Sequence, residues 1–181
     1  MALVKYNLNG HTVEYDDSEF EIVTNCYTKE KYLHYIGDGK NVTKPKGNTS
    51  CYCMFQNYKS TSLDLSKFDT SNVTDMSFMF CDCINLEHLS LLNFNTNNAK
   101  NLYEMFQNCK SLKELDISSF YIDNTKMLDN MFLDCKNLET LKVSSDYLQF
   151  FLDHRVLSDI ENDVNIIPVS KLDKVVNDLF Y

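Results

Sequence analysis

The chain has 181 residues, of which 44% are hydrophobic, and its 17 basic and 26 acidic side chains give a formal net charge of −9. This length fits one domain, and a surface of this charge repels nucleic-acid backbones and anionic membranes. Direct binding to nucleic acid or to a membrane is therefore not expected. An acidic chain can instead dock on a basic protein, including one that handles nucleic acid.

Residues 1–32 are expected to form a β cap at the N-terminal end of the single domain. Apolar and polar residues alternate on both sides of Asn9-Gly10. An Asn-Gly pair between two alternating runs predicts a β-hairpin. Phe20 and Ile22 indicate one further strand, to which Tyr27 is a candidate addition.

Residues 33–145 contain a repeat, in which the dipeptide Met-Phe returns after 25, 26 and 26 residues at 54–55, 79–80, 105–106 and 131–132. Apolar residues around each Met follow the offsets i, i+3, i+4 and i+7, which indicate a short helix. An apolar-x-apolar triplet then follows in each repeat and indicates a short strand. A period of this size predicts a solenoid, because one repeat alone cannot bury its apolar face.

Two segments carry a resemblance to a known family, "LDLSKFDTSNVTDMSFMFCDC" (63–83) and "MFQNCKSLKELDISSF" (105–120). They resemble the BspA-like leucine-rich repeats of bacterial surface proteins. The resemblance implies an α/β solenoid, with a narrow parallel sheet on one side of the leucine-rich-repeat stack and short helices on the other. It also implies a role in adhesion or in another protein–protein contact.

Residues 146–181 are expected to form a helical C-terminal cap. The first amphipathic helix is predicted from apolar residues at Leu148, Phe151, Leu152 and Val156. A short extended piece ending at Pro168 follows. The last helix is predicted from Leu172, Val175, Val176 and Leu179. Both helices can serve to cap the last repeat or to bind a partner.

The cysteines are expected to be free thiols and not metal ligands. They are Cys26, Cys51, Cys53, Cys81, Cys83, Cys109 and Cys135. Two pairs, Cys51/Cys53 and Cys81/Cys83, have a C-x-C spacing, which differs from the spacing of common structural zinc sites. The repeat phase predicts that Cys53 and Cys81 face outward and that the others within the repeats are buried. Seven is an odd number, which favours a reducing compartment.

Enzymatic signatures are lacking in the sequence. The four histidines are far apart, and the glycines of "IGDGK" (36–40) have no phosphate-loop spacing. We therefore expect a protein that is not an enzyme and uses no cofactor.

The partner-binding surface is predicted on the outward face of the strands. Its residues are Asp64, Glu87, His88, Ser90, Lys113, Glu114, Asp116, Glu139, Thr140 and Lys142. The C-terminal helices are the alternative surface.

Three functions fit these observations. The first is a non-enzymatic module that binds a protein partner through its repeat surface. The second is an inhibitor encoded by a phage or mobile element, which blocks a basic nucleic-acid-handling protein of the host. The third is a fragment of a surface adhesin. Residues 1–20 lack a basic start, an apolar run and a cleavage site, so a cytoplasmic location is expected, with the cell surface as the alternative if a signal was removed.

Overall fold

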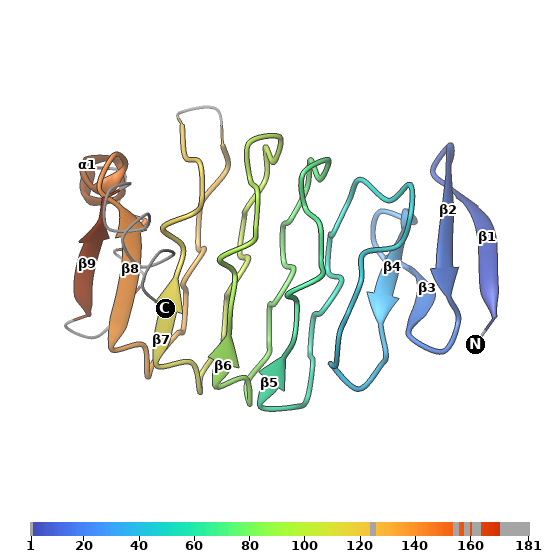
Figure 1. Ribbon diagram of the computed structural model, residues 1–181, viewed down its shortest axis with the longest axis horizontal. Coiled ribbons are helices and arrows are strands. Elements are labelled where there is room, and N and C mark those ends of the chain that lie inside the picture. Colours follow the sequence, from blue (N-terminus) through green and yellow to red (C-terminus); the bar gives the residue numbers. More distant parts are fainter. Residues whose placement is uncertain (1, 124–125, 154–155, 158–159, 161–163, 171–181) are drawn as a thin grey trace.

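The computed structural model describes residues 2–123, 126–153, 156–157, 160 and 164–170. The chain advances along the longest axis of the molecule from its N-terminal strands at one end to its C-terminal elements at the other (Figure 1). Neighbouring copies of the repeat therefore lie side by side, and equivalent residues of successive repeats are close in space.

Two antiparallel hairpins begin the fold. Strand β1 (Leu3–Leu8) pairs with β2 (His11–Asp16), and β3 (Phe20–Thr24) pairs with β4 (Lys31–Tyr35). The first hairpin turns at Asn9-Gly10, where both residues have positive φ. The predicted hairpin and the further strand are thus confirmed, but Tyr27 lies in the turn between β3 and β4 and is not part of the strand.

The strands of the repeats are short and form separate parallel sheets. Strand β5 (Ser62–Leu63) pairs with β6 (His88–Leu89), while β7 (Glu114–Asp116) pairs with β8 (Thr140–Ser144), which in turn pairs with β9 (Asn165–Val169). Among the described residues, β6 and β7 are not paired.

The expected fold class is wrong. The described residues form four small sheets and one six-residue helix, α1 (Leu148–Asp153). They do not form a leucine-rich-repeat solenoid with one narrow parallel sheet and a short helix in each repeat. The segments around each Met-Phe pair are successions of tight turns.

Left-handed backbone explains why these segments are not helical. In each repeat the residue before Met and the third residue after it have φ between 52° and 62°; these residues are Cys53 and Asn57, Phe78 and Asp82, Glu104 and Asn108, and Asn130 and Asp134. A left-handed residue cannot continue a right-handed helix. Backbone hydrogen bonds instead join adjacent repeats, as from Phe55 N to Met79 O at 2.9 Å.

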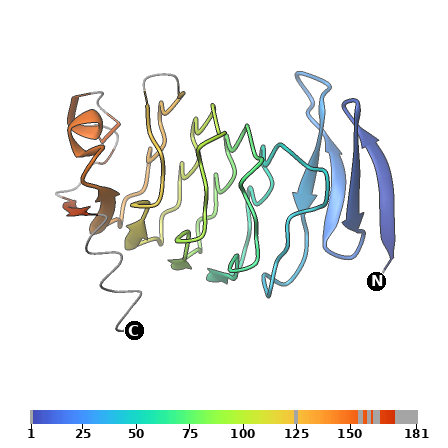
Figure 2. The same ribbon diagram turned by 45° about the horizontal axis from the view of Figure 1, so that its top comes forward.

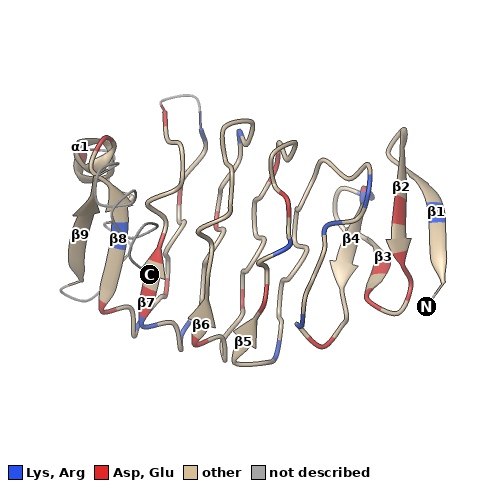
Figure 3. Cartoon of the chain, viewed as in Figure 1, with Lys and Arg blue, Asp and Glu red and all other residues tan. Residues whose placement is uncertain are grey.

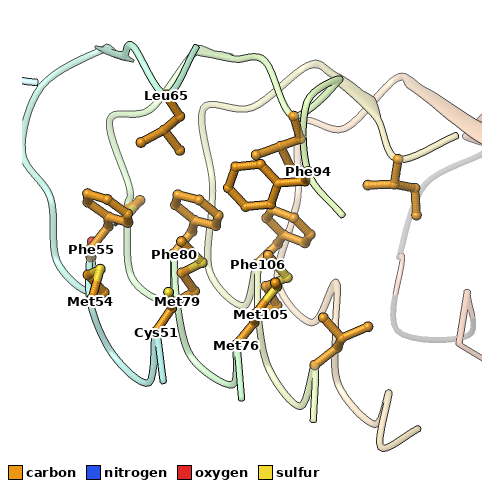
Figure 4. Packing of buried hydrophobic residues seen from close by; sticks show 14 of the residues in the cluster. Cys51, Met54, Phe55, Leu65, Met76, Met79, Phe80, Phe94, Met105 and Phe106 are labelled. Carbon is orange, nitrogen blue, oxygen red and sulfur yellow. Dashed lines mark hydrogen bonds between the residues drawn. The ribbon is translucent and has the colours of Figure 1, made fainter. Parts of the chain in front are cut away.

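The Met-Phe pairs form the centre of the core. All four Met and all four Phe side chains are fully buried, as the repeat predicts. The ring centroid of Phe80 lies 5.5 Å from that of Phe55 and 5.6 Å from that of Phe106, and the interplanar angles are 6° and 3° (Figure 4). This column of stacked rings holds successive repeats at a constant spacing, and so sets the spacing of the strands at the surface.

The C-terminal end also differs from the prediction of a helical cap. Helix α1 buries Phe151 but leaves Leu152 exposed, and the extended piece around Pro168 is strand β9. Pro168 fits there because β9 is an edge strand, in which a missing N–H breaks no ladder bond. The last predicted helix lies in 171–181, outside the described residues. No helix in the described part of the chain has the length and apolar character needed to traverse a bilayer.

Candidate functional site

A groove of about 1040 Å³ crosses the face formed by the strands of the repeats. Strands β5, β6, β7 and β8 follow one another along one edge of the molecule (Figure 2). Nine of the ten predicted site residues line this groove, namely Asp64, Glu87, His88, Ser90, Lys113, Glu114, Asp116, Thr140 and Lys142. Glu139 is the predicted residue that does not.

The strand register arranges the groove side chains in rows. His88 lies opposite Ser62, and Thr140 lies opposite Glu114. Because paired strands are about 4.8 Å apart, a side chain of β5 is close to its equivalent in β6, and a side chain of β7 is close to its equivalent in β8. The groove therefore depends on several repeats, and no repeat forms it alone.

Two of the predicted carboxylates also stabilise the fold. Asp64 accepts a hydrogen bond from the backbone N–H of Ser66 at 3.0 Å, and Asp116 accepts one from Ser118 at 2.9 Å. Hydrogen bonds from the Ser66 hydroxyl and backbone lower the pKa of Asp64. Charge reversal at either Asp would therefore disturb the turn that follows its strand.

Other charges in the groove are available to a partner. Glu87, Lys113 and Glu114 are exposed, and among the described residues their side chains make no hydrogen bond or ion pair. Acidic and basic segments are interspersed around β5 to β8 (Figure 3). These three side chains can meet a charged partner without first breaking an internal contact.

A loop before the first strand of the repeats closes one end of the groove. The Gly39 carbonyl accepts a hydrogen bond from Asp64 N at 2.8 Å, and Gly39 N donates to the Tyr35 hydroxyl at 2.8 Å. Gly39 has a φ of 80°. This left-handed backbone, which favours glycine, brings Lys40 to the rim of the groove.

The strand-face prediction omitted the leucines that line the groove, of which Leu89 and Leu92 are not buried. Leu92 occupies the slot that holds Ser66, Ser118 and Ser144 in the other repeats. An alignment of the repeats would have singled it out, because an apolar residue at a polar slot breaks the pattern.

A family model described as "Mycoplasma protein of unknown function, DUF285" matches residues 49–149, more than half of the 181 residues. The chain belongs to the DUF285 family. This match corrects the resemblance to BspA-like leucine-rich repeats, and the left-handed turns around each Met-Phe pair are the structural counterpart of that correction. No curated protein and no solved structure matches the chain. The matched DUF285 region contains all the predicted site residues, but its description states no function.

The cysteines of this DUF285 region form part of its core. Cys83, Cys109 and Cys135 donate S–H hydrogen bonds to the carbonyls of the Phe in the preceding repeat, at 3.1, 3.2 and 3.0 Å. Cys53 and Cys81 are buried, so their predicted outward orientation is wrong. Within the residues that the structure describes, no three His, Cys, Asp or Glu side chains are grouped to hold a metal ion.

Thiol labelling is expected to separate Cys26 from the other cysteines. Cys26 is exposed, whereas the other six are buried. Burial raises the pKa of Cys135 to about 12, so its reactive thiolate is scarce at neutral pH. A maleimide at pH 7 should label one thiol per native chain and seven in denaturant without reductant. Rapid labelling of two or more thiols in the native protein would contradict the burial described here.

The protein is expected to lose stability as the pH rises above about 9. Burial raises the pKa of Cys51 to about 12 and of Cys53 to about 11, from an ordinary value of 9.0. As the pH rises, the unfolded chain therefore releases these protons before the folded chain does. The unfolded state then binds fewer protons than the folded state, so the free energy of unfolding falls. The urea midpoint should be lower at pH 10.5 than at pH 8, and the fall should be smaller in Cys51→Ala. Equal midpoints at both pH values would contradict this expectation.

Proposed function

We propose that this chain is a non-catalytic module that binds a segment of another protein in the strand-face groove. The observation that carries the proposal is that nine side chains from four successive repeats line one continuous groove. Their charges are spread along the groove and do not converge on one point, which suits recognition of an extended surface better than a chemical step.

The size and the available charges of the groove support the same proposal. Its volume of about 1040 Å³ lies just above the range for small-molecule pockets, about 300–1,000 Å³. Glu87 and Glu114 are exposed and unpaired among the described residues. Such rim charges speed association with an oppositely charged partner and help to select it.

The overall charge favours a basic protein as the partner. The net charge of −9 raises the encounter rate with a positively charged surface at low ionic strength. A nucleic-acid-handling protein is one such partner, and inhibition of a host protein of this kind stays a prediction. The adhesin role, the cytoplasmic location and the absence of a cofactor stay predictions as well.

Affinity capture with a matched charge control tests the proposal. The groove variant carries Glu87→Lys and Glu114→Lys, and the control variant carries Glu21→Lys and Glu30→Lys, which make the same charge change in the N-terminal hairpins. All four glutamates are exposed, so neither variant is expected to unfold. Immobilised wild type and control should retain from a bacterial lysate a protein that the groove variant loses. Identical capture by all three would remove the groove as the binding surface.

A further inference from the structure

The second repeat departs from the others at the centre of the groove. Where the first and third repeats have the Asp-x-Ser pairs Asp64–Ser66 and Asp116–Ser118, the second has Ser90 and Leu92. Leu92 is 64% exposed and lines the groove. The substitution therefore exposes an apolar side chain where the repeat otherwise has a hydroxyl.

Leu89 adds to this apolar surface. It is half-buried, whereas the leucines at the same slot of the other repeats are buried; these are Leu63, Leu115 and Leu141. Leu89 lies in β6, which is paired on its β5 side and, among the described residues, unpaired on its β7 side. We define Leu89 and Leu92 as the leucine centre of the groove.

Carboxylates line the groove in both repeats that flank the leucine centre, and Lys113 lies in one of these repeats as well. In the flanking repeats Asp64 and Asp116 occupy the slot of Ser90, and Glu87 and Glu114 also line the groove. Two of the groove lysines lie toward its ends, because Lys40 precedes the first repeat strand and Lys142 belongs to β8. An apolar centre with a charged rim is the usual arrangement of a protein-binding hot spot.

We propose that the leucine centre takes an apolar side chain of a partner segment in which basic residues flank that side chain. This inference rests on the proposed function and specifies its partner. In an extended segment, residues two positions apart point to the same side and are about 7 Å apart. Lysine or arginine side chains two residues before and after the apolar one would thus reach the carboxylates of the flanking repeats.

A displayed library of random 12-residue peptides tests the inference, with selection on immobilised full-length protein. Leu92→Ser is the test variant, because it restores the residue of the other repeats and should fold as they do. Ile84→Ser is its matched control, since Ile84 is 40% exposed in the same repeat and does not line the groove. Equal thermal midpoints of the two variants would show that a difference in peptide binding between them is not caused by unfolding.

Selected peptides should share an apolar residue flanked by lysine or arginine. Their affinity should fall about tenfold or more in Leu92→Ser, as expected for loss of a buried leucine contact, and stay unchanged in Ile84→Ser. Peptides lost in the groove variant Glu87→Lys, Glu114→Lys but unaffected by Leu92→Ser would overturn this inference and leave the proposed function standing.

Two other outcomes also decide the matter. Peptides that bind the groove variant as well as wild type, or no enriched peptide at all, would count against both the inference and the proposed function. A wild-type dimer that Leu92→Ser converts to a monomer in sedimentation would assign the leucine centre to a second copy of this chain, and would overturn the basic partner proposed here.

Discussion

Replacing Phe80 with alanine is expected to lower the free energy of unfolding by about 3–5 kcal/mol. The Phe80 ring is fully buried and stacks on Phe55 on one side and on Phe106 on the other. Its removal leaves a cavity in the middle of the aromatic column, and the flanking repeats cannot close that cavity because their own hydrogen bonds hold them at a fixed spacing.

Urea denaturation followed by far-UV circular dichroism measures this loss. Tyr27→Ala is the control, because the Tyr27 side chain is 90% exposed and its removal should change the stability by no more than about 0.5 kcal/mol. A loss below about 1 kcal/mol for Phe80→Ala would mean that the ring column is not the centre of the core.

Gly47→Ala is expected to destabilise the protein by about 2–5 kcal/mol, from left-handed strain and two weakened hydrogen bonds. Gly47 has a φ of 78°, and an added Cβ would lie 2.4 Å from the Thr12 carbonyl oxygen. The adjacent Lys46 exchanges two backbone hydrogen bonds of 2.9 Å with Glu14 of β2. A methyl group at Gly47 would push this loop away from the hairpin.

Comparison with Gly10→Ala separates the backbone strain from the clash between the added Cβ of Gly47→Ala and the Thr12 carbonyl oxygen. Gly10 also has a positive φ, 91°, but no atom lies within 4 Å of a Cβ placed there. Only the backbone strain of about 1–2 kcal/mol should appear in this variant. Equal losses in the two variants would show that the loop around Gly47 does not pack against β2 as described.

The sequence predicted the features that depend on local patterns. The Asn9-Gly10 hairpin followed from turn chemistry, and the burial of the Met-Phe pairs followed from their period. The strand-face residues were predicted from alternation, and the structure brings nine of the ten together in one groove.

The features that the sequence did not predict depend on contacts between repeats. The offsets i, i+3, i+4 and i+7 are typical of a helix. In this protein they occur in successive turns, where every second backbone N–H donates to a carbonyl of the next repeat, as Cys53 and Phe55 do. Left-handed backbone at Phe78 and Glu104 gives no signal in the sequence, because bulky residues rarely adopt it. The burial of Cys53 and Cys81 follows from the same turns.

The partial exposure of Leu89 could not be predicted from the sequence for a different reason. Its slot is buried in every other repeat, so the repeat alone predicts burial. Its exposure accompanies the unpaired junction between β6 and β7, which is a property of two strands and not of one residue.

Crosslinking across the strand register tests most directly whether the repeats lie side by side and so build the groove. In a Cys26→Ser background, the pair Ser62→Cys and His88→Cys places two exposed thiols directly opposite each other on β5 and β6. A bifunctional thiol reagent with a span of about 5 Å, the spacing of paired strands, should link this pair quickly. It should link the offset pair Ser62→Cys and Ser90→Cys slowly. Equal rates for the two pairs, or a faster rate for the offset pair, would contradict the register on which the groove depends.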